Sequence, residues 1–328
     1  MKTEFELIES LRAKSKIQNP KSKILVGIGD DCAVISQNSK TDLVITTDML
    51  VEDVDYRRDW MQPDLLGHKA LAVSLSDIAA MGAKPTWALL SIGVPENIWK
   101  SNFVKKFYQG WFDLAKNFDV GLVGGDISKT PDKIVIDSIV AGKVKKNRAI
   151  LRSGAKVGDL IFATGELGGA AGGLTLLETG LRFNQEKGWR KKLMQRQLKP
   201  LPQIFVGEIL AKKQLATAMI DLSDGLSSDL THLCAASNVG ARIYADKIPL
   251  DANLKNEPEL NNRALSLALN GGEDFELLFT VNPQNLKIVK KLLASQTLIG
   301  EITKPSQQVT IVYKNETKLL SNGGFKHF

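Results

Sequence analysis

The sequence predicts a mixed α/β (α+β) protein of two domains, and three observations carry this prediction. The chain has 328 residues, about twice the length of an average domain. Short apolar strands alternate with longer segments of helical periodicity in both halves. Between Lys145 and Gly158 the composition changes to basic residues and glycine, which indicates a boundary. We therefore expect an N-terminal domain over residues 1–148 and a C-terminal domain over residues 149–328.

In the first half, the spacing of apolar residues distinguishes helices from strands. Apolar residues at helical spacing predict helices at residues 4–16, 65–81 and 102–118. Gly82 and Pro85 end the second of these helices. Short apolar runs predict strands at residues 24–28, 43–47, 87–94, 121–123 and 134–140.

The second half repeats the alternation. A strand is expected at residues 159–164, followed by a glycine-rich turn over residues 165–173 that leads into a helix. A further strand is expected at 218–222 and a helix at 226–236. The glycines of the turn fit two roles: backbone N–H groups that bind an anion, or close packing of the helix.

Composition excludes several classes of protein. No apolar run approaches the roughly 18 residues that span a bilayer. The N-terminal segment contains acidic residues in a helix-like pattern, which is not typical of a signal peptide. The cysteines are Cys32 and Cys234, with no CxxC pair, so a disulfide scaffold or a thiolate zinc site is not expected. We expect a cytoplasmic protein with no membrane partner.

The net charge of +7 is concentrated in residues 143–152 and 182–199. Such runs usually form a solvated face, and this interpretation is favoured. The alternative is a basic nucleic-acid-binding protein, which would need aromatic residues among the basic ones for stacking. Residues 182–199 contain only Phe183 and Trp189, so no nucleic-acid partner is expected.

Aspartates stand where several strands are expected to end. The segments concerned are Leu43–Asp48, Gly121–Asp126 and Ala218–Asp224, together with Gly27–Asp31 after the first strand. Asp77 lies near the end of an apolar helix, where the helix dipole opposes a carboxylate. Each aspartate alone could be a cap or a turn residue, but five such motifs together predict a multi-carboxylate metal site.

Oxygen ligands indicate which metal such a site would take. The three histidines are scattered, so zinc and copper are disfavoured. An aspartate and threonine set suits Mg²⁺, which keeps waters and substrate phosphates in its shell. The sequence thus predicts Mg²⁺-dependent phosphate chemistry, although it has neither a P-loop nor a protein-kinase motif set.

An ordered set of segments resembles the thiamine-monophosphate kinase family and covers nearly the whole chain. These segments are Gly27–Ala33, Thr46–Glu52, Lys69–Ala83, Gly124–Asp126, Arg152–Ala155, Ile220–Leu226, Gly271–Leu277 and Gly324–Phe328. The wider superfamily includes aminoimidazole ribonucleotide synthetase, selenophosphate synthetase and a hydrogenase maturation protein. The resemblance implies an aminoimidazole ribonucleotide synthetase-like fold and a homodimer whose N-terminal sheets pair.

The resemblance also implies an activity and a set of site residues. ATP would phosphorylate thiamine monophosphate directly, without a general base or a covalent intermediate, in a cleft between the domains. The implied ligands of several Mg²⁺ ions are Asp31, Thr46, Thr47, Asp48, Asp77, Asp126, Asp221 and Asp224. The implied ATP contacts are Tyr108, Gly125, Asp126, Arg152 and Ser223. The implied contacts to thiamine monophosphate are Asp55, Glu273 and Phe325.

One position departs from the family pattern. The family has Glu-Gly-Val-His-Phe where this chain has Glu52-Asp53-Val54-Asp55-Tyr56, so Asp55 replaces a histidine expected to contact the substrate. A carboxylate there would repel a phosphate unless a metal or Arg57 intervenes, which leaves the identity of the acceptor open.

The alternative is another ATP-using member of the superfamily. Selenophosphate synthetase needs a reactive residue earlier than Cys32, and the hydrogenase maturation protein needs a C-terminal cysteine where this chain has His327-Phe328. Aminoimidazole ribonucleotide synthetase is disfavoured by the wording of the motifs alone.

Overall fold

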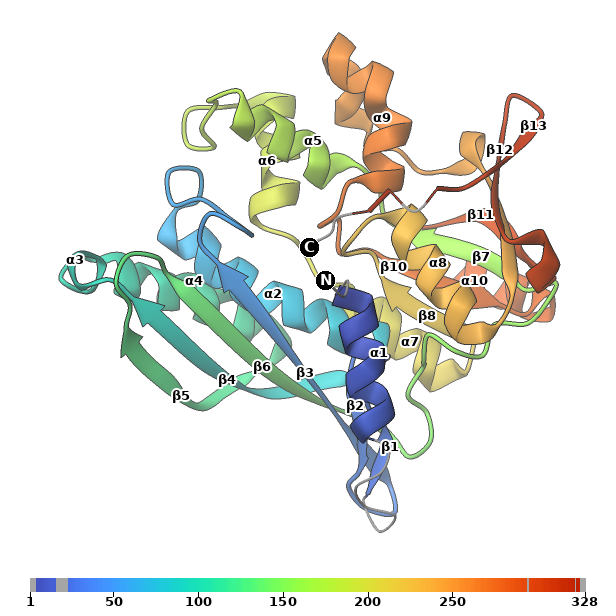
Figure 1. Cartoon of the computed structure of the whole chain (residues 1–328), viewed down its shortest axis with the longest axis horizontal. Helices are drawn as coiled ribbons and strands as arrows, with labels where there is room; N and C mark the ends of the chain where they lie inside the picture. Colours follow the sequence, from blue (N-terminus) through green and yellow to red (C-terminus); the bar gives the residue numbers. More distant parts are fainter. Residues whose placement is uncertain (1–3, 16–22, 294, 322, 325–328) are drawn as a thin grey trace.

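The computed structural model describes residues 4–15, 23–293, 295–321 and 323–324. Figure 1 shows two sheets with helices around them, one in each half of the chain. Phe325, an implied substrate contact, lies outside the described residues.

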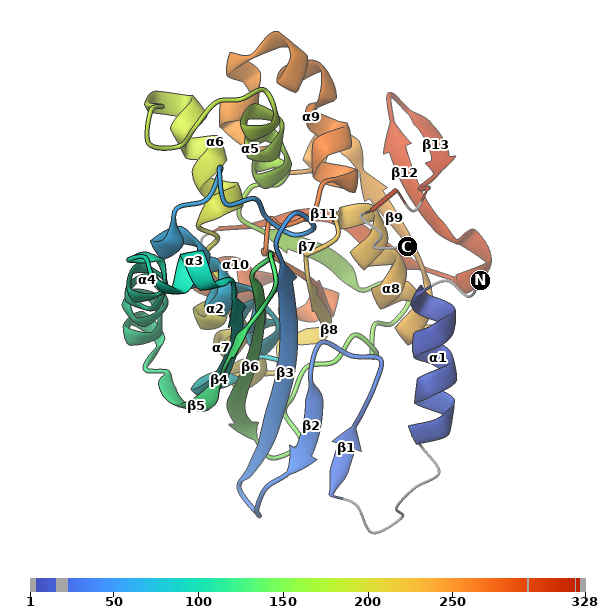
Figure 2. The same ribbon diagram turned by 60° about the vertical axis from the view of Figure 1, so that its left-hand side comes forward.

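The first sheet has six strands and is mostly antiparallel. In sequence order they are β1 (Ile24–Val26), β2 (Ala33–Ser36), β3 (Thr41–Val51), β4 (Lys84–Val94), β5 (Gly121–Lys129) and β6 (Val135–Lys145). The spatial order is β1-β2-β3-β6-β4-β5, and β4 and β5 run parallel. The helices of this half are α1 (Glu4–Ser15), α2 (Pro63–Ala80), α3 (Glu96–Trp99) and α4 (Phe103–Phe118). Figure 2 shows α2 and α4 on one side of this sheet.

The second sheet has seven strands in the order β13-β12-β9-β11-β7-β10-β8. They are β7 (Leu160–Thr164), β8 (Ala216–Asp221), β9 (Gly240–Tyr244), β10 (Leu277–Val281), β11 (Gln296–Thr303), β12 (Val309–Tyr313) and β13 (Glu316–Leu319). The helices are α5 (Gly169–Glu178), α6 (Gly188–Leu198), α7 (Ile204–Lys213), α8 (Leu226–Ser237), α9 (Pro258–Asn270) and α10 (Leu286–Leu292).

The predicted fold class is confirmed, but the expectation that each strand ends at its aspartate is wrong for two strands. β3 and β5 continue past the aspartates that were expected to end them, so Asp48 and Asp126 lie inside strands. β5 was predicted too short because it is an edge strand whose residues are largely exposed and need not be apolar. β2 was missed because its four residues follow a turn rich in aspartate.

The domain boundary after residue 148 falls in the connection between β6 and β7 and remains a prediction.

Helix α2 lies between the two halves and is buried on all sides. Of its 18 residues, 15 are buried, as expected of a helix that is apolar around its whole circumference. It packs on α4, β3 and β6 in its own half and on α7 and β8 in the other. One core cluster therefore contains Phe162, Met219 and Phe279 of the second sheet together with α2, while the opposite face of that sheet packs in a separate cluster with α8.

Two glycines allow α2 and α4 to approach closely. A Cβ added at Gly67 would overlap the carbonyl oxygen of Phe107, and one added at Gly110 would overlap that of Asp64. Backbone therefore packs directly on backbone at this crossing, which fixes the position of α2 on the first sheet.

We expect Gly67→Ala to destabilise the protein by about 2 kcal/mol, because the cost of overpacking exceeds the gain in helix propensity. Chemical denaturation would measure the difference. Gly121→Ala is the matched control, since its added Cβ meets nothing closer than 4.0 Å. Equal stabilities of the two variants would contradict the close crossing of α2 and α4.

Candidate active site

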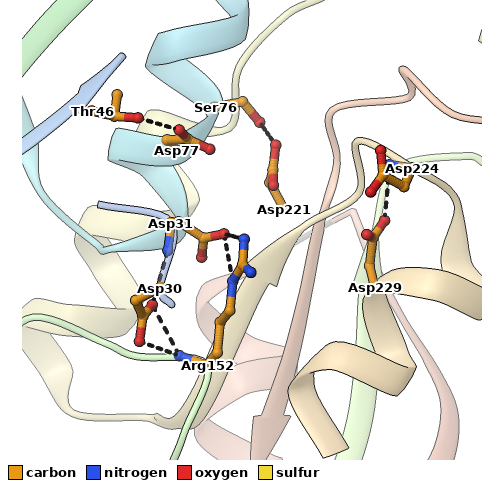
Figure 3. Close-up of polar contacts among 9 residues, drawn as sticks. All are labelled: Asp30, Asp31, Thr46, Ser76, Asp77, Arg152, Asp221, Asp224 and Asp229. Atoms are coloured by element: carbon orange, nitrogen blue, oxygen red, sulfur yellow. Dashed lines mark hydrogen bonds and ion pairs between the residues drawn. The ribbon is translucent and has the colours of Figure 1, made fainter. Parts of the chain in front are cut away.

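Three aspartates from three elements meet at the junction of the two halves. Asp31 precedes β2, Asp77 lies on α2, and Asp221 is the last residue of β8. Each offers a carboxylate oxygen, and these oxygens lie within 4.8 Å of one another. Figure 3 shows the three side chains converging from separate parts of the chain. The structure thus brings together residues that the sequence separates widely.

The hydroxyl and guanidinium groups around this acidic cluster do not balance its charge. Thr46 donates a hydrogen bond to Asp77, and Ser76 Oγ donates to Asp221 Oδ2 at 2.7 Å. Among the described residues, Arg152 is the cation that contacts the cluster, with Nε 2.9 Å from Asp31 Oδ1 (Figure 3).

Asp48 adds a further carboxylate. It lies two residues after Thr46 on β3, and residues two apart in a strand face the same side. Within the described ranges, Asp48 Oδ2 and Asp31 Oδ2 are buried and have no hydrogen-bond partner. Buried carboxylate oxygens without donors are costly, so the donor set fits a hard cation that prefers oxygen ligands.

The pKa values report the same imbalance. Burial raises the pKa of Asp48 to about 6, and nearby Asp137 and Asp31 add to the shift. Burial, followed by the charge of Asp31, raises the pKa of Asp221 to about 8. Burial and the charges of Asp48 and Asp221 hold the pKa of Asp77 well above its ordinary value. The surrounding protein therefore supplies too little positive charge to offset the cost of ionising these buried groups.

Asp30 is a further member of the site that the motif contained but the prediction left out. Its carboxylate accepts the backbone N–H of Arg152 at 3.2 Å, and burial raises its pKa to about 7. Asp30 and Asp31 thus hold both the backbone and the side chain of Arg152.

Two residues predicted as metal ligands lie on the other face of the first sheet. Thr47 Oγ1 donates to Asp137 Oδ1 at 2.7 Å, on the face opposite Thr46 and Asp48. Asp126 is aligned with Ser91, which is itself aligned with Asp137, so Asp126 shares that face. Within one chain these residues are separated from the acidic cluster by the sheet.

The predicted nucleotide contacts are similarly divided. Arg152 and Ser223 lie at the junction of the halves, whereas Tyr108 packs on Phe107 and Phe112 of α4. Gly125 has φ of 153°, and an added Cβ would overlap the carbonyl oxygen of Leu90. The close pairing of β4 and β5 is therefore enough to require glycine at position 125.

Asp224 stands at the start of α8, at a distance from the three-aspartate cluster in Figure 3. The backbone N–H groups of Asp224 and Gly225 donate to Asp229 Oδ2 at 3.2 and 3.1 Å. Asp229, in the first turn of α8, therefore holds the backbone that leads into this helix, and Asp224 lies in the wall of the neighbouring cavity.

A cavity of about 590 Å³ lies between the two halves next to the acidic cluster. Its wall includes Asp48, Asp55, Lys69, Val73, Gln197, Ser223, Asp224, Glu273, Gly323 and Gly324. Gly323 and Gly324 are the last residues of the chain that the structure describes. Asp55 Oδ2 accepts a hydrogen bond from the backbone N–H of Val51 at 2.7 Å, so this carboxylate stabilises the local turn.

The glycine-rich turn binds the chain's own anion. The backbone N–H groups of Gly168 and Ala170 at the start of α5 donate to the Asp274 carboxylate at 2.6 and 3.1 Å. Gly173 meets the backbone of Leu193 on α6, so close packing also requires glycine here. Both roles considered for the turn are thus observed. Its glycines allow close packing on α6, and the anion that its N–H groups bind is the Asp274 carboxylate.

The basic segment 182–199 is partly used in internal contacts. Arg182 pairs with Asp59 at 2.6 Å, across the two halves, and Arg196 pairs with Glu276 at 3.1 Å. Lys191 lies over the ring of Phe183, 4.9 Å from its centroid. Part of this basic segment therefore makes ion pairs and ring contacts within the protein, in addition to forming a solvated face.

Two cavity residues were missed by sequence reasoning. Lys69 could have been found from the sequence, because a basic residue is unusual within an apolar helix such as α2. Gln197 lies in the basic segment, and nothing in the sequence distinguishes it from its neighbours.

Comparison with known proteins decides the family. Two family models match this chain. The model of the AIR synthase related protein, N-terminal domain, matches residues 29–144, and the model of its C-terminal domain matches residues 156–312. A thiamine-monophosphate kinase of Buchnera aphidicola (subsp. Acyrthosiphon pisum) is 40% identical over 99% of each chain. The Escherichia coli kinase of the same name is 38% identical over 99% of this chain and 98% of its own. This chain belongs to the thiamine-monophosphate kinase family.

Solved structures agree with the family assignment. AaThiL complexed with AMPPCP and TMP matches with a TM-score of 0.85 at 32% identity, covering 99% of this chain and 97% of the other. The hydrogenase maturation protein HypE of Escherichia coli has a TM-score of 0.70 at 17% identity, which shows a shared fold alone. The family resemblance and the expected fold are confirmed. Among the described residues, no helix of this family member is long and apolar enough to cross a bilayer.

We expect the protein without divalent cations to lose stability as the pH rises from about 4 to about 8. The ordinary pKa of an unfolded aspartate is about 3.9, and that of folded Asp221 is about 8. The raised value stabilises the fold while the group is protonated, and this contribution is lost as the pH rises through the folded pKa. Thermal unfolding in a chelator would show the decrease.

Asp221→Asn should reduce this decrease, because an amide does not ionise. Identical pH profiles for Asp221→Asn and the unmodified protein would contradict the assignment of the shift to Asp221.

Proposed function

We propose that this chain transfers the γ-phosphoryl group of ATP to thiamine monophosphate in the presence of Mg²⁺, giving thiamine diphosphate and ADP. The observation that carries the proposal is the full-length match to a family structure that is complexed with AMPPCP and TMP. The acidic cluster beside a cavity between the halves supports it from this chain's own geometry.

We propose Mg²⁺ because the donors are carboxylate and hydroxyl oxygens, two of them buried without a hydrogen-bond partner among the described residues. The proposed ligands of several Mg²⁺ ions are Asp31, Thr46, Asp48, Asp77, Asp221 and Asp224 on the side of the acidic cluster, and Thr47 and Asp126 on the opposite face of the first sheet. When bound, Mg²⁺ supplies the positive charge that a transferring phosphoryl group requires.

The protein's own side chains then position the two substrates. Arg152 contacts the acidic cluster and Ser223 lines the cavity, and both are proposed to contact the ATP phosphates. Glu273 lines the same cavity and is proposed to contact the thiamine part. Tyr108, Gly125 and Asp126 complete the proposed ATP contacts, and Asp55 and Phe325 complete those to the acceptor. No general base is assigned, because the acceptor phosphate oxygen is already ionised at neutral pH.

We expect thiamine diphosphate to form only when ATP, thiamine monophosphate and Mg²⁺ are all present, as followed by chromatography. Asp48→Asn and Asp224→Asn should each lower turnover at least about 100-fold, since each removes charge from the site of phosphoryl transfer. Circular dichroism would verify that both variants fold.

Near-normal turnover of both variants would exclude the proposed metal ligands. ATP binding without thiamine diphosphate formation would instead indicate a different acceptor, consistent with Asp55 in place of histidine.

We also propose a homodimer formed through the face of the first sheet that lies opposite α2 and α4. Ile45, Leu89 and Ile139 lie on the face opposite α2 and α4 and are only half buried. Pairing through this face would bury them, and it would place a second copy against Thr47 and Asp126. The proposed compartment is the cytoplasm, where ATP is available.

We expect Ile139→Arg to convert a dimer into a monomer, because burying an unpaired charge in an apolar interface is costly. Light scattering would measure the mass in solution. Asn117→Arg on an exposed position of α4 adds the same charge outside the interface and should leave the mass unchanged. A dimer that persists in Ile139→Arg would place the interface elsewhere.

A further inference from the structure

Lys69 is a fully buried lysine in the wall of the cavity. Its side chain is 0% exposed, and lysine is almost never buried to this extent unless it is paired. Its Nζ lies 2.6 Å from Glu273 Oε1. Over the ranges that the structure describes, no acceptor forms a well-aligned hydrogen bond with this ammonium. The pair with Glu273 is therefore the main protein interaction that compensates its burial.

Glu273 is held from both halves of the molecule. Lys69 on α2 contacts one carboxylate oxygen, and Gln197 Nε2 on α6 donates to the other. The backbone N–H of Glu273 donates to the carbonyl oxygen of Ser223 at 2.8 Å. The side chain remains 28% exposed toward the cavity that Lys69 and Gln197 also line. Its carboxylate is therefore fixed in position and still accessible to a ligand.

Helix α2 sets the distance between this carboxylate and the acidic cluster. Lys69, Val73 and Asp77 follow one another at intervals of four and so share one face of the helix. Eight residues at about 1.5 Å each place Asp77 about 12 Å from Lys69 along the axis. Val73, between them, also lines the cavity. A ligand whose phosphate lies at the acidic cluster would therefore place its far end near Glu273.

We propose that Lys69 and Gln197 are positioning residues that hold Glu273 to recognise the aminopyrimidine end of the acceptor. The inference rests on the proposed function, because thiamine monophosphate has a phosphate at one end and an aminopyrimidine ring at the other. The amino group of that ring is an N–H donor, and an ionised carboxylate is purely an acceptor. Recognition through a fixed carboxylate needs its two oxygens oriented in advance, which Lys69 and Gln197 achieve.

Steady-state kinetics of the Mg²⁺-loaded full chain tests this role. In Lys69→Met and in Gln197→Leu, KM for thiamine monophosphate should rise about tenfold or more, while KM for ATP stays within about twofold. Lys106→Met, at an exposed position of α4, is the matched control and should change neither constant. Failure of the unmodified chain to form thiamine diphosphate would count against the proposed function. An unchanged KM for thiamine monophosphate in both cavity variants would count against the present inference.

A double-mutant cycle with Glu273→Gln separates positioning from a structural role. If Lys69 acts through Glu273, Lys69→Met should cost less than about threefold in kcat/KM once Glu273 is replaced. Losses that multiply in the double variant would overturn the inference. Should Lys69→Met fail to fold, the cycle between Gln197→Leu and Glu273→Gln provides the same test.

A substrate analogue gives a readout that a structural defect would not produce. Thiamine monophosphate whose pyrimidine amino group is replaced by oxygen has a carbonyl acceptor in place of the amino donor, and its remaining N–H is on the ring nitrogen. The unmodified protein should prefer the amino form by about tenfold or more in kcat/KM, and Lys69→Met should lose most of that preference. The same preference in both proteins would overturn the inference.

Discussion

The burial of α2 between the two halves is the constraint on which the rest of the structure depends. The helix has no exposed side along which it could shift, and at Gly67 its backbone rests directly on α4. Because β8 and α7 pack on its other side, the orientation of the second half is set by the same helix. Lys69, Ser76 and Asp77 are therefore placed by the hydrophobic core, not by a surface loop.

The acidic cluster has the opposite energetic character. Its carboxylates are buried near one another with a single guanidinium contact, from Arg152, among the described residues. Burial in such surroundings favours the protonated form, as the pKa values of Asp48 and Asp221 indicate. The core around α2 supplies the stability that makes this unfavourable arrangement possible, and a bound cation would relieve it.

Much of the fold and part of the site could be predicted from the sequence. The long elements have clear periodicity, and the ordered motifs identified Asp31, Asp77 and Asp221 before the structure showed them converging. The sequence predicts these aspartates at strand ends, whereas Asp48 lies within β3. Local periodicity does not reveal strand pairing, so it could not show that the sheet is mainly antiparallel.

Other features depend on contacts between distant segments. The period of two in β3 implies that Thr46 and Thr47 face opposite sides, but only the packed sheet shows which side meets α2. Gln197 could not have been identified at all, because its importance arises from a contact with Glu273 in a different element. Lys69 could have been singled out as a charge in an apolar helix, but its partner could not.

The backbone at Glu273 and Phe275 has φ values of 68° and 49°, a region that residues other than glycine rarely adopt. Glycine would adopt either conformation at lower cost, and selection for stability alone would favour it there. Glycine at position 273, however, would remove the carboxylate that Lys69 and Gln197 hold. The strained backbone at Glu273 is thus the cost of placing a carboxylate where Lys69 and Gln197 can hold it.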